Sequence, residues 1–272
     1  MSPWSWLAVV VLVAARAASP EAADPYRLPA SVVPFRYNVL LQVDVDGGRY
    51  RGVAQIYVNV LADTDSVTLH AAPRLRFQSS AVAVQRYKPR AGERPVVRYS
   101  VVAIDGRDAD ETVTLYLSAP LERGKHYVIT FSEFDADLGS EPAGFHLASY
   151  RDGLSTRRFA MTSFKPTHAR KAFPCFDEPG FRARFEVKIA CHRRFAVRSS
   201  MPGEAAAAAA TAAAVVHRDG VQDHGGDLLR DLLRDLDPED TTVTSFDTTV
   251  PMPTYLLAWV VSDFANLTLP TR

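Results

Sequence analysis

The fold is decided by the stretch from Tyr37 to Leu61, which reads YNVLLQVDVDGGRYRGVAQIYVNVL. Apolar and polar residues alternate along its first part, and this two-residue period is typical of a strand with one buried face. Asp46-Gly47-Gly48 is a turn sequence, and the alternation resumes from Tyr50. The stretch therefore predicts a β-hairpin. In its first strand, the side chains expected to point toward the core are those of Tyr37, Val39, Leu41, Val43 and Val45.

Similar short runs continue along the chain, separated by clusters of Gly, Pro or Asp. The predicted strands are Ser66 to His70, Arg74 to Gln85, Val96 to Ile104, Thr112 to Leu117, Tyr127 to Phe131, and Phe181 to Ser199. No long amphipathic helix interrupts the first 200 residues. This spacing is typical of an all-β domain, and we expect an antiparallel, twisted sandwich or saddle.

An alanine-rich segment interrupts the strand pattern from Gly203. We interpret residues 203–240 as a low-complexity insertion. Leucines in the run from Asp227 to Leu236 recur with the spacing of one helical face, and Asp-Arg pairs stand three residues apart. We expect a short surface helix docked by its leucines and ended by Pro238, with strand pattern returning at Thr241.

The charge balance excludes nucleic acid as the main partner. The 272 residues carry 31 Lys and Arg against 31 Asp and Glu, whereas phosphate binding needs an excess of cations. An apolar content of 47% is that of a globular chain with one large domain or two small ones. A local basic cluster is either a solvated edge or a binding patch, and it comprises Arg157, Arg158, Lys165, Arg170 and Lys171.

The first residues have the pattern of a secretory leader. An uncharged run from Leu7 to Ala15 precedes small residues suited to cleavage, so residues 1–18 are predicted to be a signal peptide and residues 24–272 the domain. A short membrane anchor is the alternative, although the run is too short to span a bilayer. Asn266-Leu-Thr is a glycosylation sequon, and we expect a secreted or cell-surface protein with no other membrane span.

The segment from Met161 to Phe185 holds a rigid, irregular loop. Pro174 and Pro179 each fix their own φ and restrict the residue before them. Adjacent Asp177 and Glu178 are expected to point apart, capping backbone amides or pairing with Arg170, and not to form a catalytic pair. The loop reads Pro174, Cys175, Phe176, Asp177, Glu178, Pro179.

The sequence allows its two cysteines to be either paired or free. Cys175 and Cys191 could form a disulfide in an oxidising compartment. Cys191 lies on the apolar side of its strand pattern, which makes a buried free thiol the simpler interpretation.

The loop resembles the signature Ala-Arg-x-Ala-Phe-Pro-Cys-Phe-Asp-Glu-Pro of the aminopeptidase N-like zinc metallo-aminopeptidases, of the gluzincin type. The stretch from Phe246 to Ala258 resembles the Phe-x-Thr-Thr-x-Pro-Met-Ser-Thr-Tyr-Leu-x-Ala run of the same family. The similarity covers roughly Tyr26 to Asn266, outside the alanine-rich insertion. It implies an N-terminal β domain of an enzyme that removes N-terminal residues from peptides with zinc.

The chemistry that the resemblance implies needs an H-E-x-x-H helix and a distal glutamate. None of the seven histidines has a partner four residues away, and the family's Gly-x-Met-Glu-Asn segment is also missing. No catalytic or metal-ligating residue is therefore assigned, and the zinc belongs to a catalytic domain absent from this chain. Gly-x-Ser-x-Gly is not present either.

The resemblance implies a role for two positions before the loop. The family has Thr-Gln-Phe-Glu-Pro, whose Gln and Glu accept hydrogen bonds from the ammonium group of the substrate, and this chain has Ser163 and Lys165 there. A lysine would repel that ammonium. We expect the substrate-lip domain of a secreted aminopeptidase, inactive alone. The alternatives are a truncated secreted binding or decoy protein and a relative whose catalytic domain has lost its zinc ligands.

Overall fold

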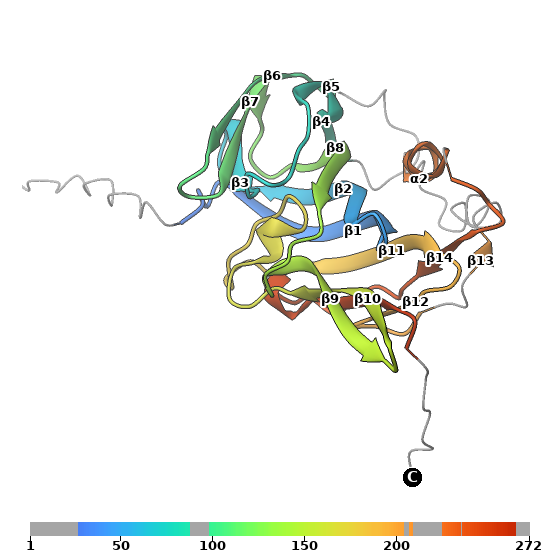
Figure 1. Ribbon diagram of the computed structural model, residues 1–272. Helices are drawn as coiled ribbons and strands as arrows, with labels where there is room; N and C mark the ends of the chain where they lie inside the picture. The colour runs from blue at the N-terminus through green and yellow to red at the C-terminus, as the bar shows by residue number, and fades with distance from the viewer. Residues whose placement is uncertain (1–26, 88–97, 204–206, 209–224, 235, 265–272) are drawn as a thin grey trace, which may run out of the picture.

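The computed structural model describes residues 27–87, 98–203, 207–208, 225–234 and 236–264, and these form an all-β structure with one α-helix (Figure 1). This confirms the predicted fold class. The largest sheet has eight strands in the order β13-β14-β11-β1-β2-β8-β4-β5. Their bounds are β1 Val32–Asp44, β2 Arg49–Val60, β4 Val82–Arg86, β5 Arg98–Tyr99, β8 His126–Asp137, β11 Arg184–His192, β13 Ala207–Ala208 and β14 Thr241–Ser245.

Two smaller sheets flank the eight-stranded one in Figure 1. A three-stranded sheet has the order β3-β7-β6, and a four-stranded sheet has the order β12-β15-β10-β9. Their bounds are β3 Thr64–His70, β6 Val101–Arg107, β7 Thr112–Leu121, β9 Gly144–Asp152, β10 Ser155–Ser163, β12 Ala196–Ser199 and β15 Trp259–Ser262. One hydrophobic cluster extends through all three sheets, so the described chain has a continuous main core.

The predicted central hairpin is present as β1 and β2. Tyr37 lies opposite Ile56, and the side chains predicted to face inward are buried. Asn38 and Leu40 on the other face of β1 are buried as well, so the prediction of a single buried face is wrong for this strand. In the turn, the Asp44 carboxylate accepts a hydrogen bond from the Gly47 N–H at 2.8 Å, and Gly48 adopts a φ of 66°. A positive φ is readily adopted by glycine, which explains the residue choice at this turn.

One pairing in the large sheet is not antiparallel. β1 and β11 run parallel, with Tyr37 opposite Phe185 and Val43 opposite Cys191. The Tyr37 and Phe185 rings stack with their centroids 4.8 Å apart. The expectation of an antiparallel arrangement is wrong for this pair. The alternation of apolar and polar residues is the same in parallel and antiparallel strands, so it does not predict the direction of pairing.

Three of the predicted strands are interrupted. The described part of the run from Val96 to Ile104 is divided at Ser100 between β5 and β6, which belong to different sheets. In the run from Arg74 to Gln85, only the end forms a strand, because the Leu75 N–H turns back to the Ala72 carbonyl and residues Ser79–Ala81 form a 3-10 helix. The run from Phe181 to Ser199 is divided by a turn in which the Phe195 N–H donates to the His192 carbonyl. The two pieces, β11 and β12, consequently belong to different sheets.

The predicted helix is α2, Gly225–Leu233. Leu232 and Leu233 are buried in a second, smaller cluster with Leu40, Val53, Ala190 and Val243 of the large sheet. Docking by leucines is therefore confirmed. The helix ends before Pro238, and Arg51 of β2 donates a hydrogen bond at 2.8 Å to the Leu232 carbonyl.

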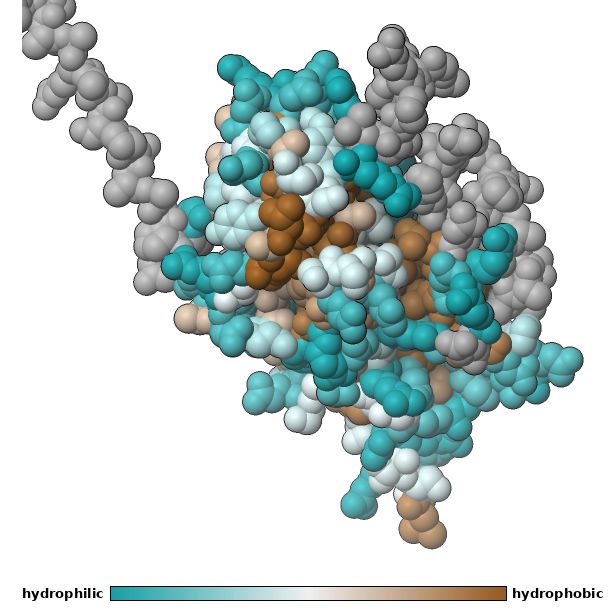
Figure 2. All heavy atoms as spheres, turned by 90° about the horizontal axis from the view of Figure 1, so that it is seen from above, coloured by the Kyte–Doolittle hydropathy of each residue, from teal (hydrophilic) through white to brown (hydrophobic). Residues whose placement is uncertain are grey.

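The surface seen from above is mostly hydrophilic and includes a compact hydrophobic area (Figure 2). Exposed large hydrophobic residues include Val102 of β6 and Leu154 beside β10. No helix in the described part of the chain is long and apolar enough to cross a membrane. The predicted signal peptide 1–18, the sequon at Asn266 and most of the 203–240 insertion lie outside the described residues.

Candidate functional site

The signature loop from Pro174 to Pro179 is attached through its backbone to two strands. Cys175 and His70 of β3 exchange backbone hydrogen bonds, at 2.8 Å from the His70 N–H and 3.0 Å from the Cys175 N–H. The next residue, Phe176, donates its N–H at 3.0 Å to the hydroxyl of Tyr37 on β1. Residues 174–177 are all buried. The loop thus joins the three-stranded sheet to the eight-stranded one.

Asp177 lies at the centre of these contacts and is 1% exposed. Its carboxylate accepts hydrogen bonds from the backbone N–H of Arg170 at 3.2 Å and from the Arg170 guanidinium at 3.1 Å. Its second oxygen accepts one from the Thr254 hydroxyl at 2.5 Å. The predicted pairing with Arg170 is confirmed, and every carboxylate oxygen of Asp177 is already engaged.

His70 completes this buried network. Its Nδ1 accepts a hydrogen bond at 3.1 Å from the Asp177 N–H. Burial, reinforced by the nearby positive charge of Arg170, lowers the pKa of His70 to about 3. The ring is therefore neutral at physiological pH, as an acceptor at Nδ1 requires.

Glu178 points away from its neighbour, as predicted. Its carboxylate accepts a hydrogen bond at 2.6 Å from the Leu28 N–H and contacts the Arg27 guanidinium at 3.2 Å. Asp177 and Glu178 thus have different partners, Arg170 and Thr254 for the first and residues 27–28 for the second. The two carboxylates act as anchors and do not form a pair suited to acid–base chemistry.

Both cysteines are buried free thiols. This confirms the simpler interpretation of Cys191 and excludes the Cys175–Cys191 disulfide. Burial raises the pKa of Cys191 to about 11. Burial, followed by the charge of Asp177, raises the pKa of Cys175 as well. A nucleophilic cysteine needs a depressed pKa, so neither thiol suits covalent catalysis.

The two lip positions lie at the end of β10 and just after it. Ser163 is the last residue of the strand, opposite Gly144, and is half-buried. Lys165 is exposed, and no described residue pairs with its ammonium. Between them, the buried Phe164 ring packs 5.2 Å from the ring of Trp259 and 6.1 Å from that of Phe173. Phe164 therefore fixes the backbone on which Ser163 and Lys165 stand.

The basic cluster predicted from sequence does not form one patch. Arg170 is 12% exposed at its side chain and paired with Asp177, whereas Arg157 lies on the distal part of β10 and pairs with Asp152 and Asp263. Lys165 is the one member of the cluster that occupies a lip position. A short segment that includes the 3-10 helix Ala169–Lys171 connects Lys165 to the signature loop.

Sequence reasoning did not identify three residues that hold the loop, namely Tyr37, His70 and Thr254. Each lies more than 70 residues from its partner in the loop. The only sequence signal was that Tyr37 falls on the inward side of its strand. Side-chain partners this distant depend on which strands become neighbours.

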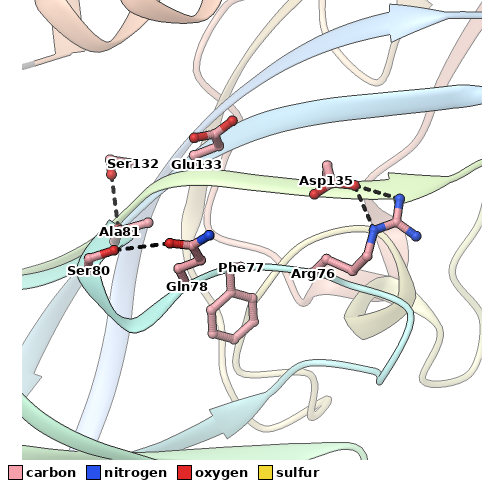
Figure 3. A pocket seen from close by; sticks show the side chains of 8 residues that line it. All are labelled: Arg76, Phe77, Gln78, Ser80, Ala81, Ser132, Glu133 and Asp135. Carbon is pink, nitrogen blue, oxygen red and sulfur yellow. Dashed lines mark hydrogen bonds and ion pairs between the residues drawn. The ribbon is translucent and has the colours of Figure 1, made fainter.

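A polar pocket of about 510 Å³ lies elsewhere, between β8 and the segment that precedes β4 (Figure 3). The Arg76 guanidinium, which lines it, is neutralised by Asp135 at 2.5 Å and Asp137 at 2.9 Å. Ser132 donates a hydrogen bond at 3.0 Å to the Ala81 carbonyl. None of the site residues predicted from sequence lines this pocket.

The zinc implied by the resemblance does not fit the residues present. Within the described residues, no group of three or more His, Cys, Asp or Glu side chains could hold a metal ion. His70 already uses Nδ1 as an acceptor. No step of a reaction is therefore derived through a metal in this chain.

Comparison with known proteins identifies the domain. Residues 33–217 match the family model described as Peptidase M1 N-terminal domain. Human endoplasmic reticulum aminopeptidase 2 is 31% identical over 245 residues, which are 89% of this chain and 22% of the relative. Endoplasmic reticulum aminopeptidase 1 of Rattus norvegicus is 27% identical over 247 residues, 90% of this chain and 23% of the relative.

Aminopeptidase N of Bos taurus is also 27% identical over 247 residues, 89% of this chain and 22% of the relative. The chain thus spans less than a quarter of the length of these relatives. The match to the family model covers well over half of the chain and includes β1, the signature loop and β11. This chain belongs to the family of Peptidase M1 N-terminal domains.

Proposed function

We propose that this chain is the substrate-lip domain of a secreted zinc-dependent aminopeptidase, an enzyme that removes N-terminal residues from peptides. The observation that carries the proposal is the family match over residues 33–217, which includes both the lip and the signature loop. We further propose that the zinc and its ligands lie outside residues 1–272, and that this chain alone does not hydrolyse peptides. Its own contribution is to position the lip beside the peptide's amino group.

The rigid attachment of the loop supports this role. Asp177, Arg170 and His70 form a buried network directly after the lip segment, and Phe164 packs on Trp259 beneath it. A lip must hold its side chains in fixed positions to discriminate among substrates. The β10 strand and the two aromatic contacts supply that fixed base.

The charge at the lip determines the expected specificity. A free Lys165 ammonium at 4 Å from a peptide ammonium costs about 1 kcal/mol in water and about 4 kcal/mol at a partly buried site. We therefore propose that this domain disfavours the unmodified N-terminus that a carboxylate at this position would attract. Ser163 offers a short hydroxyl, which only weakly compensates for this repulsion.

A chimera tests the proposal. This chain replaces the aligned N-terminal region of human endoplasmic reticulum aminopeptidase 2, and kcat/KM is measured with a peptide that has a free amino group. The Ser163→Gln, Lys165→Glu variant is expected to raise kcat/KM about tenfold or more, because repulsion of the ammonium becomes attraction. Lys125→Glu, an equally exposed lysine beyond β7, is the matched control and is expected to have no effect.

Two outcomes would contradict the lip assignment. One is an unchanged kcat/KM in the double variant of an active chimera. The other is an increase of the same size in the Lys125→Glu control, since this would show a general effect of charge. Aminopeptidase activity of the purified chain alone would overturn the claim that the chemistry is supplied from elsewhere.

A second candidate is a secreted binding or decoy protein without catalysis. The observation that favours it is the replacement of both polar lip residues, since Ser163 and Lys165 depart from the family's Gln and Glu. The transcript downstream of Arg272 decides between the two functions. An in-frame H-E-x-x-H supports the enzyme domain, whereas a stop codon supports the stand-alone protein.

A further inference from the structure

The β9–β10 hairpin extends away from the rest of the described chain at its distal end (Figure 1). Its base is part of the core, where Phe145 and Ala160 are fully buried. The eight residues 151–158 are all exposed, and Leu154 at the tip is as exposed as a free side chain, at 108%. Leu154 is the most exposed of the large hydrophobic residues in the described chain.

One face of this hairpin is held firmly. Tyr150 and Arg157 lie opposite each other, and both bind Asp263 at 2.9 Å through its two carboxylate oxygens. Arg157 also pairs with Asp152 at 2.7 Å, and the Phe264 ring lies 5.2 Å from that of Tyr150. These contacts neutralise Arg157 and fix the hairpin against the segment that follows β15.

The opposite face carries two arginines that have no partner among the described residues. Arg151 lies opposite Thr156, and Arg158 lies opposite Ser149, so these four residues share the face that Tyr150 and Arg157 do not occupy. Arg151 and Arg158 occupy diagonal corners, which in an antiparallel pair are about 7–8 Å apart. Neither has a hydrogen bond or ion pair with any described residue. Two guanidinium groups this close can bind a carboxylate or adjacent carboxylates.

The backbone beside this face is also available. β9 is the outermost strand of its sheet. Gly139 pairs with the backbone of Phe145 and Leu147, and no described residue pairs with the outer edge of β9 beyond Leu147. An extended peptide can add to such an edge through main-chain hydrogen bonds while its side chains contact one face.

We propose that the distal β9–β10 hairpin is a docking site for an extended acidic peptide segment. Its carboxylates pair with Arg151 and Arg158, its backbone adds to β9, and an apolar side chain covers Leu154. The charge of this face selects acidic partners, and the edge strand selects an extended conformation. The braced opposite face limits the entropy lost on binding, because the hairpin is already ordered.

The test uses the whole chain and a fluorescent octapeptide of alternating glutamate and leucine, with fluorescence anisotropy as the readout. A peptide with glutamine in place of glutamate is expected to bind about tenfold more weakly or worse, because charge-assisted hydrogen bonds are lost. The Arg151→Glu, Arg158→Glu variant is expected to lose binding to the same extent. Raising the salt concentration is expected to weaken binding of the acidic peptide.

A matched control changes the same charge elsewhere. Arg123 and Lys125 are exposed in the turn between β7 and β8, and Arg123→Glu, Lys125→Glu is expected to change the Kd by less than about twofold. Amide chemical shifts of the unmodified chain give a second readout that needs no variant. We expect peptide-induced shifts to be concentrated in residues 147–158.

Several results would overturn the proposal. These are equal binding of the glutamine peptide, an equal loss in the Arg123→Glu, Lys125→Glu control, and shifts concentrated away from the hairpin. Binding of a sulfated oligosaccharide at the hairpin, without binding of the acidic peptide, would show that the two arginines bind another class of ligand. The measurement involves no hydrolysis, so it is independent of the chimera that tests the lip.

Discussion

Asp177 shows how a motif that resembles a catalytic pair can serve as an anchor. Its carboxylate binds Arg170 and Thr254, its N–H binds His70, and its side chain is 1% exposed. A carboxylate that is this deeply buried and bound through both oxygens is not accessible to a substrate. The local partner Arg170 could be predicted from the sequence, whereas the distant partners could not.

Removal of the Asp177 carboxylate is expected to destabilise the domain strongly. Asp177→Ala leaves the largely buried Arg170 guanidinium with only the more distant Glu111 carboxylate, at 3.9 Å, which costs about 3 kcal/mol in the free energy of unfolding. Glu178→Ala is the matched control, and loss of its bond to the Leu28 N–H is expected to cost about 1.5–3 kcal/mol. Urea unfolding at pH 7 measures both. If Asp177→Ala is no more destabilising than Glu178→Ala, the loop is held by other contacts.

His70 makes stability depend on pH. Its pKa is about 3 in the folded chain against 6.5 as the ordinary value, so the unfolded state binds one more proton between these limits. Stability is therefore lost as the pH falls through this window, by about 2 kcal/mol between pH 7 and pH 5. More than about one pH unit above 6.5 the His70 ring is neutral in both states, and the slope vanishes.

The pH dependence is measured by urea unfolding at several pH values between 7 and 5. His70→Asn keeps an acceptor near the Nδ1 position but does not titrate, so its stability is expected to change less with pH. His192→Gln, at an exposed histidine, is the control and is expected to keep the slope of the unmodified chain. Equal slopes in His70→Asn and the unmodified chain would contradict the assignment.

At the scale of the secondary-structure elements, the alternation of apolar and polar residues predicted where most strands lie but not where each strand ends. The run from Phe181 to Ser199 is predicted as one strand, yet the chain turns at residues 193–195, where the polar residues His192, Arg193 and Arg194 interrupt the alternation. The β9–β10 hairpin was missed because its distal residues 151–158 are exposed and, apart from Gly153 and Leu154, polar, and so lack an apolar face. A buried face is the physical origin of the alternation, so an exposed hairpin does not produce it.

The docking of α2 provides a test at this scale. Leu232→Ala removes buried contacts worth about 2 kcal/mol or more, so amide hydrogen exchange in α2 is expected to accelerate about 30-fold. Leu228→Ala, at a partly buried position of the same helix, is expected to have a smaller effect. Exchange in β1 and β11 is expected to change less, because the other face of each strand packs in the main core. Equal acceleration in those strands would show that α2 opens only with the whole domain.

At the scale of the whole molecule, one hydrophobic cluster connects all three sheets. Trp259 of β15 lies inside it, with ring contacts to Phe145, Phe164 and Phe173. The parallel pairing of β1 with β11 and the signature loop join the beginning and the second half of the domain. A core shared in this way favours cooperative unfolding.

Cooperativity can be measured with the intrinsic tryptophan. From residue 7 onward Trp259 is the only tryptophan, so its fluorescence reports the four-stranded sheet, whereas far-ultraviolet circular dichroism reports all the strands. We expect the two urea transitions to coincide. A Trp4→Phe, Trp6→Phe variant serves as the control for any contribution of the first residues. An earlier fluorescence transition would show that the four-stranded sheet unfolds separately.

The sequence by itself determined the fold class, the central hairpin, the leucine-docked helix and the family resemblance. These depend on short-range patterns, namely a two-residue or helical period and a fixed order of residues in the loop. Only the tertiary structure decided that β1 and β11 run parallel, that His70, Tyr37 and Thr254 hold the loop, and that Arg151 and Arg158 share a face of the hairpin. These features depend on which distant strands become neighbours, and the free energy of burying the common core sets that choice.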